Sequence, residues 1–332
     1  MTALNIKKQN ILIIGAGSIG VRHLNNLIKL GFKNIHLYRH NSDINIIIDG
    51  QEIFVTSKWN VIQKNKYLAV IICSPTSMHV KQAIKSLKLK AHLLIEKPIS
   101  NNTLEINKLQ KLAISNKRFV FVAYMLRHHP LLKKIKEFIT NKKYGNLISF
   151  TTKWGEYLPN WHPWEDYSKS YAAREDLGGG ASLTLSHDID LVNWIVGSPI
   201  NKTYHLKNYS SNLELTAEGG SDIIYKYKNG VTGHSHFNYY SILHERYMEF
   251  TFDDANIRFD YLASSLSIFK NGKRKEIKLN NFDRNDLFIK ELKDFFNLVS
   301  KNFNKTLLVK KIEESRTILN ICKKEIWNNE KK

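Results

Sequence analysis

Residues 10–20 read NILIIGAGSIG, a short apolar run that leads into a loop with three glycines. An amphipathic stretch follows and ends at Gly31. This order predicts a buried strand, a tight turn and a helix with a glycine at its C-terminus. In the loop, Gly15 permits the turn, Gly17 lets the backbone approach a phosphate group, and Gly20 lets the helix pack close to the strand.

The start of the predicted helix is suited to binding an anion. Free N–H groups and the positive end of the helix dipole meet there. We therefore expect a dinucleotide to place its pyrophosphate at this loop. The residues expected to contact it are Gly15, Gly17, Ser18, Ile19 and Gly20. A glycine pattern alone is a weak signal, and the strand before it and the helix after it strengthen the prediction.

Strands and helices alternate up to about residue 125. Short apolar runs predict the strands, and amphipathic stretches predict helices between them. After the first strand, the predicted strands cover residues 34–38, 53–56, 68–73, 92–96 and 119–124, and the predicted helices cover 77–88 and 100–116. This alternation predicts an α/β domain whose parallel sheet is covered on both faces.

In such a domain, ligands bind at the carboxyl ends of the strands. Several residues follow predicted strands and are expected at this edge. They are Ser74, Pro75, Thr76, Glu96, Lys97 and Arg127. Lys97 is chemically apt, because an amine at a strand end beside a bound ligand can polarise a reacting oxygen and relay its proton. A purely structural salt bridge between Glu96 and Lys97 is the alternative.

The segment after the second strand bears on the choice between NAD and NADP. NAD sites usually have an acidic residue there, which binds the ribose 2′-hydroxyl. Here residues 38–42 read YRHNS, and the first acid is Asp43. Arg39 and Ser42 are suited to hold a 2′-phosphate, so NADP(H) is the expected cofactor and NAD(H) the alternative. Arg39 as an ordinary solvated residue is the competing interpretation.

The pattern changes after about residue 145. Apolar alternation predicts strands at residues 146–154, 221–228, 231–240, 246–253, 256–261 and 267–270. Turn signals join several of them, which favours an antiparallel meander. Helical periodicity returns from residue 286 to residue 327. We therefore expect two domains, residues 1–125 and 126–332.

Composition restricts the range of partners. The 332-residue chain has a formal net charge of +20, which suggests an anionic partner. The lysines are scattered singly and in pairs, so a solvated basic surface is the preferred interpretation and nucleic acid is not an expected partner. No apolar run reaches the roughly 18 residues that span a membrane. Two cysteines without zinc-type spacing suit a cytoplasmic protein with no metal site.

These motifs resemble those of the Gfo/Idh/MocA oxidoreductases, the family of glucose–fructose oxidoreductase and inositol dehydrogenase. The similarity runs from the glycine loop to Glu96-Lys97-Pro98, its most specific piece, and on to residues 127–130 and 178–190. It implies a Rossmann domain followed by an α+β domain with an open, mostly antiparallel sheet. It also implies that the cofactor site includes Cys73, Ser74, Pro75, Thr76, His79, Glu96 and Lys97.

The resemblance also implies hydride transfer on a sugar or polyol, with a second domain that binds the substrate and forms a homodimer or homotetramer on its open sheet. The family's helix carries an aspartate, a histidine four residues later and a second aspartate three further on. His187 and Asp190 match the last two, whereas Leu183 stands at the first. His187 is still the expected general acid/base, because an imidazole has an ordinary pKa of about 6.5. Asp190 is expected to orient it or to bind substrate.

Residues 154–180, WGEYLPNWHPWEDYSKSYAAREDLGGG, combine three tryptophans and three tyrosines with a histidine, several charges and three final glycines. Aromatic faces suit the apolar faces of sugar rings, and basic side chains bind carboxylate or phosphate groups. We expect this segment to cover the substrate, with a subunit contact as the alternative. The expected substrate contacts are Arg127, Tyr157, His162, Trp164, Tyr171, Arg174 and His187.

The leading functional hypothesis is an NAD(P)-dependent oxidoreductase acting on a sugar or a sugar derivative, by analogy with family members linked to surface-polysaccharide sugars. One alternative is an enzyme that retains its cofactor and uses transient oxidation for hydrolysis or epimerisation. Another is a dinucleotide-binding sensor without turnover. The incomplete Asp–His pair favours the sensor, and the presence of Lys97 and His187 opposes it.

Overall fold

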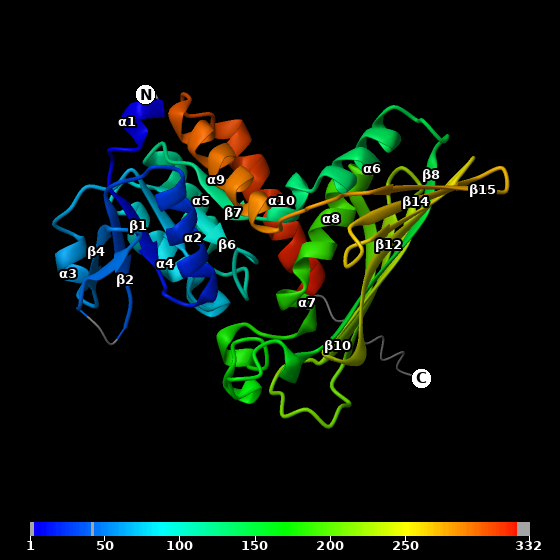
Figure 1. The fold of residues 1–332 in the computed structure, drawn as a ribbon, viewed down its shortest axis with the longest axis horizontal. Helices are drawn as coiled ribbons and strands as arrows, with labels where there is room; N and C mark the ends of the chain where they lie inside the picture. Colours follow the sequence, from blue (N-terminus) through cyan, green and yellow to red (C-terminus); the bar gives the residue numbers. More distant parts are fainter. Residues whose placement is uncertain (1–2, 41–42, 324–332) are drawn as a thin grey trace. The chain divides into compact units, whose positions relative to one another are not determined.

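The computed structural model describes residues 3–40 and 43–323, which form two compact units (Figure 1). The first unit comprises the described residues up to Met125 together with Arg284–Leu319. The second comprises Leu126–Asp283 and the described residues after Leu319. Residues 284–319 were expected in the second domain, but they pack with the first unit.

The first unit is built on a seven-stranded sheet with the order β3-β4-β2-β1-β5-β6-β7. Its parallel strands are β1 (Ile11–Ile14), β2 (Ile35–Tyr38), β4 (Gln51–Thr56), β5 (Ala69–Ile72), β6 (His92–Glu96) and β7 (Val120–Ala123). Strand β3 (Ile46–Ile48) joins β4 in antiparallel orientation at the edge, and the sequence analysis missed it. The mostly parallel sheet confirms the expected Rossmann-type α/β fold.

Helices α2 (Ser18–Lys29) and α9 (Asn285–Ser300) share one core with β1. Ile13 of β1 lies in this core with Leu24 of α2 and Phe295 of α9. The other residues of β1 are buried as well, as expected for a strand covered on both faces. Because α9 supplies large apolar side chains to this core, the segment that contains it belongs to the first unit.

The other helices of the first unit are shorter or begin later than the sequence predicted. Helix α4 (His79–Leu87) packs against α5 (Ile106–Ser115), which was expected to begin at about residue 100. The remaining α-helices are α1 (Ala3–Ile6), α3 (Trp59–Ile62) and α10 (Lys305–Lys323). Helix α10 belongs to this unit up to Leu319.

The second unit is built on an eight-stranded sheet with the order β15-β14-β13-β12-β8-β11-β10-β9. The strands are β8 (Leu147–Tyr157), β9 (Ile200–Asn208), β10 (Gly220–Tyr227), β11 (Thr232–Asn238), β12 (Tyr240–Phe252), β13 (Asn256–Asp260), β14 (Ser265–Lys270) and β15 (Lys273–Lys278). The pairings are antiparallel except that of β8 with β11, which confirms a mostly antiparallel sheet. The expected simple meander is interrupted, because β8 lies between β11 and β12.

Helices cover one face of this second sheet. Figure 1 shows α6 (Pro130–Thr140) and α8 (Ser186–Val196) along that face, with α7 (Ala181–Thr184) leading into α8. Strand residues on the covered face are buried, among them Tyr225 and Phe237. The opposite face exposes apolar side chains on β9 and β10, including Leu206 and Ile224.

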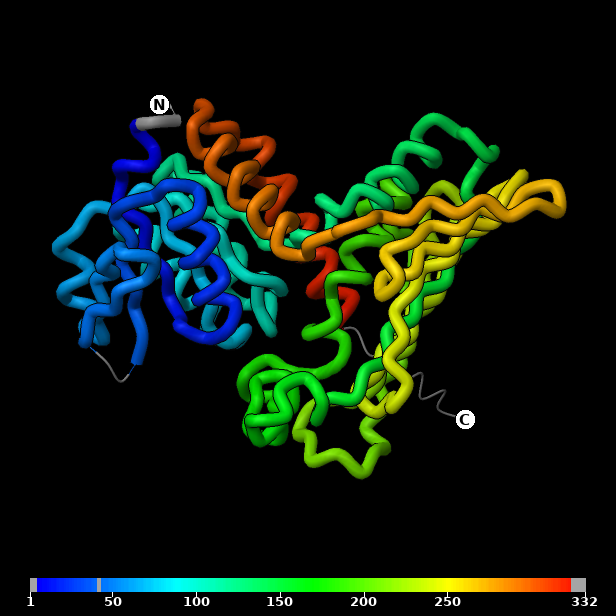
Figure 2. The backbone as a smooth tube through the Cα atoms, in the orientation of Figure 1, coloured from blue at the N-terminus to red at the C-terminus, as the bar shows by residue number. Residues whose placement is uncertain are grey.

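The segment between β8 and α7 forms a compact set of turns at one end of the second unit, beside the loop between β9 and β10 (Figure 2). The backbone N–H of Glu214 donates to the hydroxyl of Tyr167 at 3.1 Å, and that of Thr216 donates to the carbonyl of Ala173 at 3.0 Å. The aromatic segment is therefore tied to the adjacent loop of its own unit.

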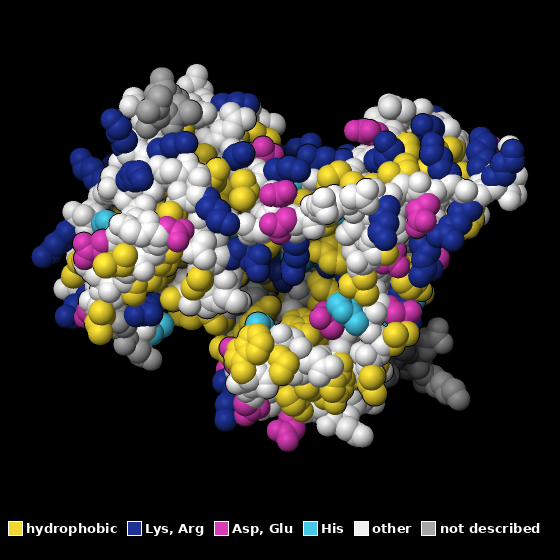
Figure 3. Space-filling view, in the orientation of Figure 1, with side chains coloured by type: hydrophobic (Ala, Val, Ile, Leu, Met, Phe, Trp, Pro, Cys, Tyr) yellow, Lys and Arg dark blue, Asp and Glu magenta, His cyan; other side chains and the backbone are white. Residues whose placement is uncertain are grey.

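Basic side chains are spread over the visible face of the protein and do not gather in one patch (Figure 3). This distribution agrees with the scattered lysines of the sequence. Across residues 3–40 and 43–323, no helix has both the length and the apolar character needed to cross a membrane.

Candidate functional site

The three glycines of the loop between β1 and α2 have different surroundings. Gly15 has a φ of 101°, and a Cβ atom there would lie 2.7 Å from the carbonyl oxygen of Cys73. A Cβ atom on Gly20 would clash with the carbonyl of Gly15, whereas one on Gly17 would meet nothing within 4 Å. The fold itself therefore requires Gly15 and Gly20, while the space beside Gly17 is open to a ligand.

The N-terminus of α2 fits an anion. Its first intrahelical hydrogen bond runs from the N–H of Val21 to the carbonyl of Gly17 at 3.0 Å. The N–H groups of Ser18, Ile19 and Gly20 have no acceptor within the helix, and no acidic side chain lies in the first turn. These features fit the phosphates of a dinucleotide. Direct contact between these residues and the cofactor stays a prediction.

Among the residues after β2, Arg39 was expected to hold a 2′-phosphate, and the structure describes it together with Asp43. The Nε atom of Arg39 is buried and makes no hydrogen bond to the described residues. Asp43 accepts hydrogen bonds from the backbone N–H and the hydroxyl of Ser57, at 2.6 and 2.9 Å, and pairs with Lys58 at 3.3 Å. The bonds from Ser57 lower the pKa of Asp43 to about 2. Ser42, also expected to bind a 2′-phosphate, lies outside the described residues.

The turn after β5 holds four residues expected at the cofactor site. Cys73 and Thr76 are 7% and 3% exposed, and burial raises the pKa of the Cys73 thiol. Ser74 and Pro75 are partly exposed, and the Ser74 hydroxyl donates to the amide oxygen of Gln82 at 2.6 Å. The structure thus places Cys73 and Thr76 inside the turn and leaves Ser74 and Pro75 accessible at its surface.

Glu96 and Lys97 lie where β6 ends. The Oε1 atom of Glu96 lies 2.8 Å from Nε2 of His23, a fully buried residue of α2. The Oε2 atom of Glu96 accepts the backbone N–H of Lys97 at 3.3 Å. Lys97 itself is partly exposed, and the Lys97–Pro98 peptide bond is cis. The sequence analysis missed His23, because only the fold brings α2 against the end of β6.

His79 lies buried between the turn after β5 and the turn after β6. It is 1% exposed, and each ring nitrogen lies 2.8 Å from a backbone carbonyl oxygen, Nδ1 from Pro98 and Nε2 from Ser74. The ring therefore joins the turn after β5 to the turn after β6. This is a supporting position, and direct contact between His79 and the cofactor stays a prediction.

In the second unit, two residues that were assigned separate roles bind each other. Arg127 follows β7, and Asp190 lies in α8. The Nε and Nη2 atoms of Arg127 donate to the two carboxylate oxygens of Asp190 at 2.9 and 2.6 Å. Asp190 is 1% exposed. This forked ion pair is strong and directional, so Asp190 holds Arg127, and its orientation of His187 stays a prediction.

His187 lies in the first turn of α8 and is 7% exposed. The next residue, Asp188, anchors this helix to the sheet through Arg246 of β12, with an N–O distance of 2.5 Å. The Arg246 guanidinium lies 3.5 Å from the ring centre of Trp154 and 4.2 Å from that of Tyr261. Burial raises the pKa of Asp188, and the charge of Arg246 opposes that rise. The helix start that carries His187 is therefore firmly held.

The glycines that precede α7 pack against protein and not against open space. A Cβ atom on Gly179 would clash with the carbonyl oxygens of Tyr171 and Ala172. Gly180 has a φ of 103°, and a Cβ atom there would clash with the carboxylate of Glu218. These two positions therefore need glycine so that the aromatic segment can turn back against the start of α7.

The substrate residues expected in the aromatic segment differ in accessibility. Trp164 is 77% exposed and Tyr171 is 39% exposed, and the His162 ring stands edge-on to Trp164 at 5.3 Å. Tyr157, at the end of β8, is partly buried. Arg174 donates two hydrogen bonds to Asp176 of the same segment, at 3.0 and 2.6 Å. Arg174 is thus already paired, whereas the rings of Trp164 and Tyr171 are exposed.

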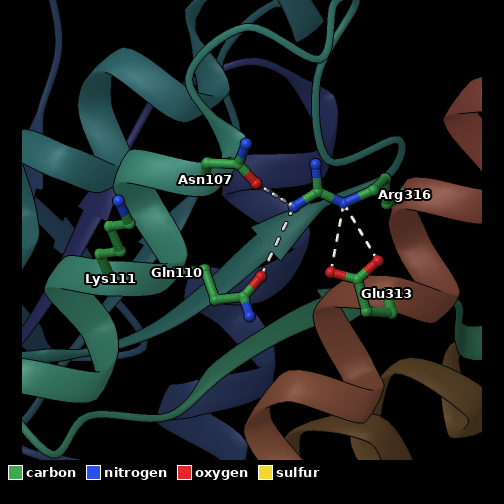
Figure 4. Close-up of a pocket in the computed structure, with 5 residues that line it drawn as sticks. All are labelled: Asn107, Gln110, Lys111, Glu313 and Arg316. Atoms are coloured by element: carbon green, nitrogen blue, oxygen red, sulfur yellow. Dashed lines mark hydrogen bonds and ion pairs between the residues drawn. The ribbon is translucent and has the colours of Figure 1, made fainter.

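A polar recess of about 430 Å³ lies between α5 and α10 of the first unit (Figure 4). Arg316 of α10 donates to Asn107 of α5 at 2.9 Å and pairs with Glu313 at 3.1 Å. The other residues that line the recess are Gln110 and Lys111. None of the residues expected to bind cofactor or substrate lines this recess, and its central arginine joins two helices.

Two family models match the chain. One, described as an oxidoreductase family with an NAD-binding Rossmann fold, covers residues 9–124, and the other, the GFO/IDH/MocA C-terminal domain, covers residues 132–258. The chain belongs to the Gfo/Idh/MocA family. The resemblance drawn from the glycine loop and the Glu-Lys-Pro tripeptide is thereby confirmed.

Relatives in this family include an uncharacterised oxidoreductase, YrbE, of Bacillus subtilis, which is 28% identical over 199 residues or 58% of this chain. The myo-inositol 2-dehydrogenase of Thermotoga maritima is 22% identical over 231 residues or 67% of this chain. The chain spans 55% and 66% of the lengths of these two relatives.

Two solved family structures share the fold. A levoglucosan dehydrogenase in complex with NADH has a TM-score of 0.75 at 16% identity, covering 93% of this chain and 98% of that one. A mutant of KijD10, a 3-ketoreductase from Actinomadura kijaniata in complex with TDP-benzene and NADP, has a TM-score of 0.79 at 16% identity, covering 94% and 96%. At this identity the likeness concerns the fold alone.

Proposed function

We propose that the protein is an NAD(P)-dependent oxidoreductase that transfers a hydride between a nicotinamide and the hydroxyl or carbonyl group of a sugar or sugar derivative. The glycine loop carries this proposal, because the space beside Gly17 is open and the first turn of α2 holds no acidic residue. Such a helix N-terminus accepts a pyrophosphate. Strands β1 and β6 are parallel in one sheet, so Lys97 follows a strand end at the same edge as the loop.

Lys97 and His187 are the proposed proton-handling groups. A bound nicotinamide would supply the hydride chemistry, so the substrate hydroxyl would have to lose its proton on oxidation, and a carbonyl would have to gain one on reduction. The Lys97 ammonium polarises the reacting oxygen, and His187 exchanges the proton with it. Asp190 contributes through the fork that holds Arg127, a substrate-binding residue in this proposal.

NADP(H) is the proposed cofactor. The positive charge of Arg39 suits a 2′-phosphate, and its buried Nε has no hydrogen-bond partner among the described residues. Asp43, the first acid after β2, is engaged by Ser57 and Lys58. A carboxylate already held in this way is poorly placed to bind a ribose 2′-hydroxyl.

The proposed substrate is a sugar, a polyol or a nucleotide-linked sugar. Exposed rings such as Trp164 and Tyr171 can stack on the apolar face of a sugar. Relatives with named activities act on myo-inositol and levoglucosan, and one structural neighbour is a 3-ketoreductase with a bound TDP compound. These classes define which compounds to test first.

The test is a panel assay with purified protein, NADP⁺ or NAD⁺, and myo-inositol, levoglucosan or a nucleotide-linked hexose. Formation of reduced cofactor, followed by absorbance, together with a carbonyl product seen by NMR supports the proposal. Hydrolysis or epimerisation without net cofactor reduction supports the cofactor-retaining alternative. Tight NADPH binding without any product from a broad panel, in either direction, supports the sensor.

A further inference from the structure

Two buried histidines hold the residues on either side of Lys97. His23 of α2 is 0% exposed, and its Nε2 lies 2.8 Å from Oε1 of Glu96. The second oxygen of Glu96 accepts the backbone N–H of Lys97 at 3.3 Å. The His23 ring also stands edge-on to Phe288 of α9, with the ring centres 6.0 Å apart. The Glu96 carboxylate thus connects the helix after the glycine loop to the backbone of Lys97.

His79 holds the other side of the same turn. Its Nδ1 lies 2.8 Å from the carbonyl oxygen of Pro98, and its Nε2 lies 2.8 Å from that of Ser74. The ring is 1% exposed, so no water replaces these contacts easily. The ring bridges the turn after β6 and the turn after β5, with an N–H donated to one of the two carbonyl oxygens and the other ring nitrogen in contact with the second. The turn after β5 is a second edge of the expected cofactor site.

The arrangement is costly to disturb. A buried carboxylate that loses its hydrogen-bond donor keeps the full cost of its desolvation. A reacting group displaced by about 1 Å can lose on the order of a hundredfold in rate. The residues before and after Lys97 are each fixed by one buried imidazole, so small shifts of either ring move the backbone from which the lysine side chain extends.

We propose that His23 and His79 are positioning residues for Lys97. His23 acts through Glu96, and His79 acts through Pro98. The inference rests on the proposed role of Lys97 in proton transfer. Since His23 lies on the helix that begins at the glycine loop, the same network couples the phosphate-binding loop to the catalytic turn.

A purely structural role for the two histidines is the competing explanation, and the chain offers a matched control. His92 lies at the other end of the same strand, β6, and its Nδ1 accepts the backbone N–H of Phe119 at 3.1 Å. His92→Leu therefore removes a partly buried histidine and its hydrogen bond from β6 without touching the residues that flank Lys97.

The experiment compares His23→Leu, His79→Leu and His92→Leu with the wild type, and includes His23→Gln, whose amide still donates an N–H to Glu96. The first readout is the rate at which N-hydroxysuccinimidyl acetate acylates Lys97, measured by peptide mass spectrometry against the exposed Lys88. This readout needs neither substrate nor turnover. Fluorescence titration with NADPH and thermal unfolding are measured on every variant.

We expect His23→Leu and His79→Leu to change the acylation rate of Lys97 relative to Lys88, while His92→Leu leaves it unchanged. With a substrate from the panel, kcat should fall by about 10–100-fold in both variants, while the Kd for NADPH stays within about twofold. His23→Gln should restore most of the loss, which a general packing defect would not allow.

Two outcomes separate this inference from the proposed function. If Lys97→Met abolishes turnover but the histidine variants change neither acylation nor kcat beyond the His92→Leu control, the positioning role is overturned and the proposed function stands. If the histidine variants change Lys97 acylation but Lys97→Met is fully active, the network is real and the proposed role of Lys97 is wrong.

Discussion

At the scale of single residues, the loop glycines divide into those required by the fold and one that is not. Gly15 and Gly20 lie against backbone, so any side chain there forces the loop apart. Gly17 has an extended backbone, with φ −71° and ψ −177°, and open space where a side chain would extend. Substitution at Gly17 therefore tests the ligand without breaking the loop.

We predict that Gly17→Asp loses cofactor binding and keeps its fold. An aspartate is a favoured N-cap residue, so α2 is preserved, but its charge repels a pyrophosphate by roughly 1–4 kcal/mol. Fluorescence titration should show the Kd for NADPH raised by at least about tenfold. Gly17→Asn, of the same size without the charge, is the control and should lose less. Equal NADPH affinity in all three proteins would remove the dinucleotide site from this loop.

Arg39 decides the cofactor preference in our proposal. Charge-assisted hydrogen bonds contribute about 1.5–3 kcal/mol, so Arg39→Ala should weaken NADPH binding by about 10–100-fold. NADH lacks the 2′-phosphate, and its Kd should change little. Tighter binding of NADH than of NADPH by the wild type would show that the preference is the reverse.

Much of the candidate site could be predicted from single residues of the sequence. The site residues that could not be predicted share one cause. The glycine loop and Lys97 are recognisable because their signals are local in sequence. His23 and Arg246 are not, because their partners Glu96 and Asp188 lie 73 and 58 residues away. One signal was available for Arg246, since it stands in phase with inward-facing Met248 and is a charge on the buried side of its strand.

At the scale of elements, β6 joins the proposed chemistry to the stability of the fold. Its last residue is Glu96, and its first is His92. Burial lowers the pKa of His92 to about 4, and nearby Arg118 adds to the effect. Because Nδ1 of His92 accepts the N–H of Phe119, the residue before β7, protonation breaks a bond between β6 and the approach to β7.

We predict a pH-dependent loss of stability from His92. The pKa of His92 in the folded protein is depressed below its value of about 6.5 in the unfolded chain. Its contribution to the free energy of unfolding is therefore complete above about pH 6.5 and declines as the pH falls toward about 4. The full decline is at most about 3 kcal/mol. Denaturant unfolding at several pH values should show a smaller decline for His92→Asn, which keeps an acceptor and does not titrate. The same slope in both proteins would exclude His92 as its source.

Elements with strong local periodicity were predicted, and elements decided by distant contacts were not. The bounds predicted for the strongly apolar strands β1 and β5 lie within one residue of the bounds in the structure. Strand β15, with the sequence KRKEIK, carries too many charges to read as a strand and exists because β14 offers it an edge. The position of α9 in the first unit depends on Phe295 and its neighbours finding a core formed near the start of the chain.

At the scale of the whole molecule, the helices of residues 3–40 and 43–323 leave one face of the second sheet uncovered (Figure 1). Three apolar side chains are exposed on its outer strands, Tyr204 at 41%, Leu206 at 62% and Ile224 at 53%. Clustered exposed apolar side chains mark contact surfaces. We propose that this face joins two or four copies of the chain, as expected from the family resemblance.

We predict that Leu206→Asp lowers the oligomeric state, because a carboxylate on each copy would be buried without a partner. Sedimentation velocity at micromolar concentration measures the change. Leu104→Asp is the matched control, since Leu104 is 84% exposed and belongs to the first unit and not to this sheet. A monomeric wild type, or an unchanged mass for Leu206→Asp, contradicts the proposal.

The most direct test of the account is single-turnover hydride transfer with the best substrate of the panel, in wild type, Lys97→Met and His187→Ala. General acid–base help is typically worth about 10²–10⁴-fold, so each variant should react slower by about that factor while its Kd for NADPH stays near the wild-type value. Lys88→Met, at an exposed position, is the control and should react normally. Full wild-type rates in both Lys97→Met and His187→Ala would contradict the proposed proton transfer.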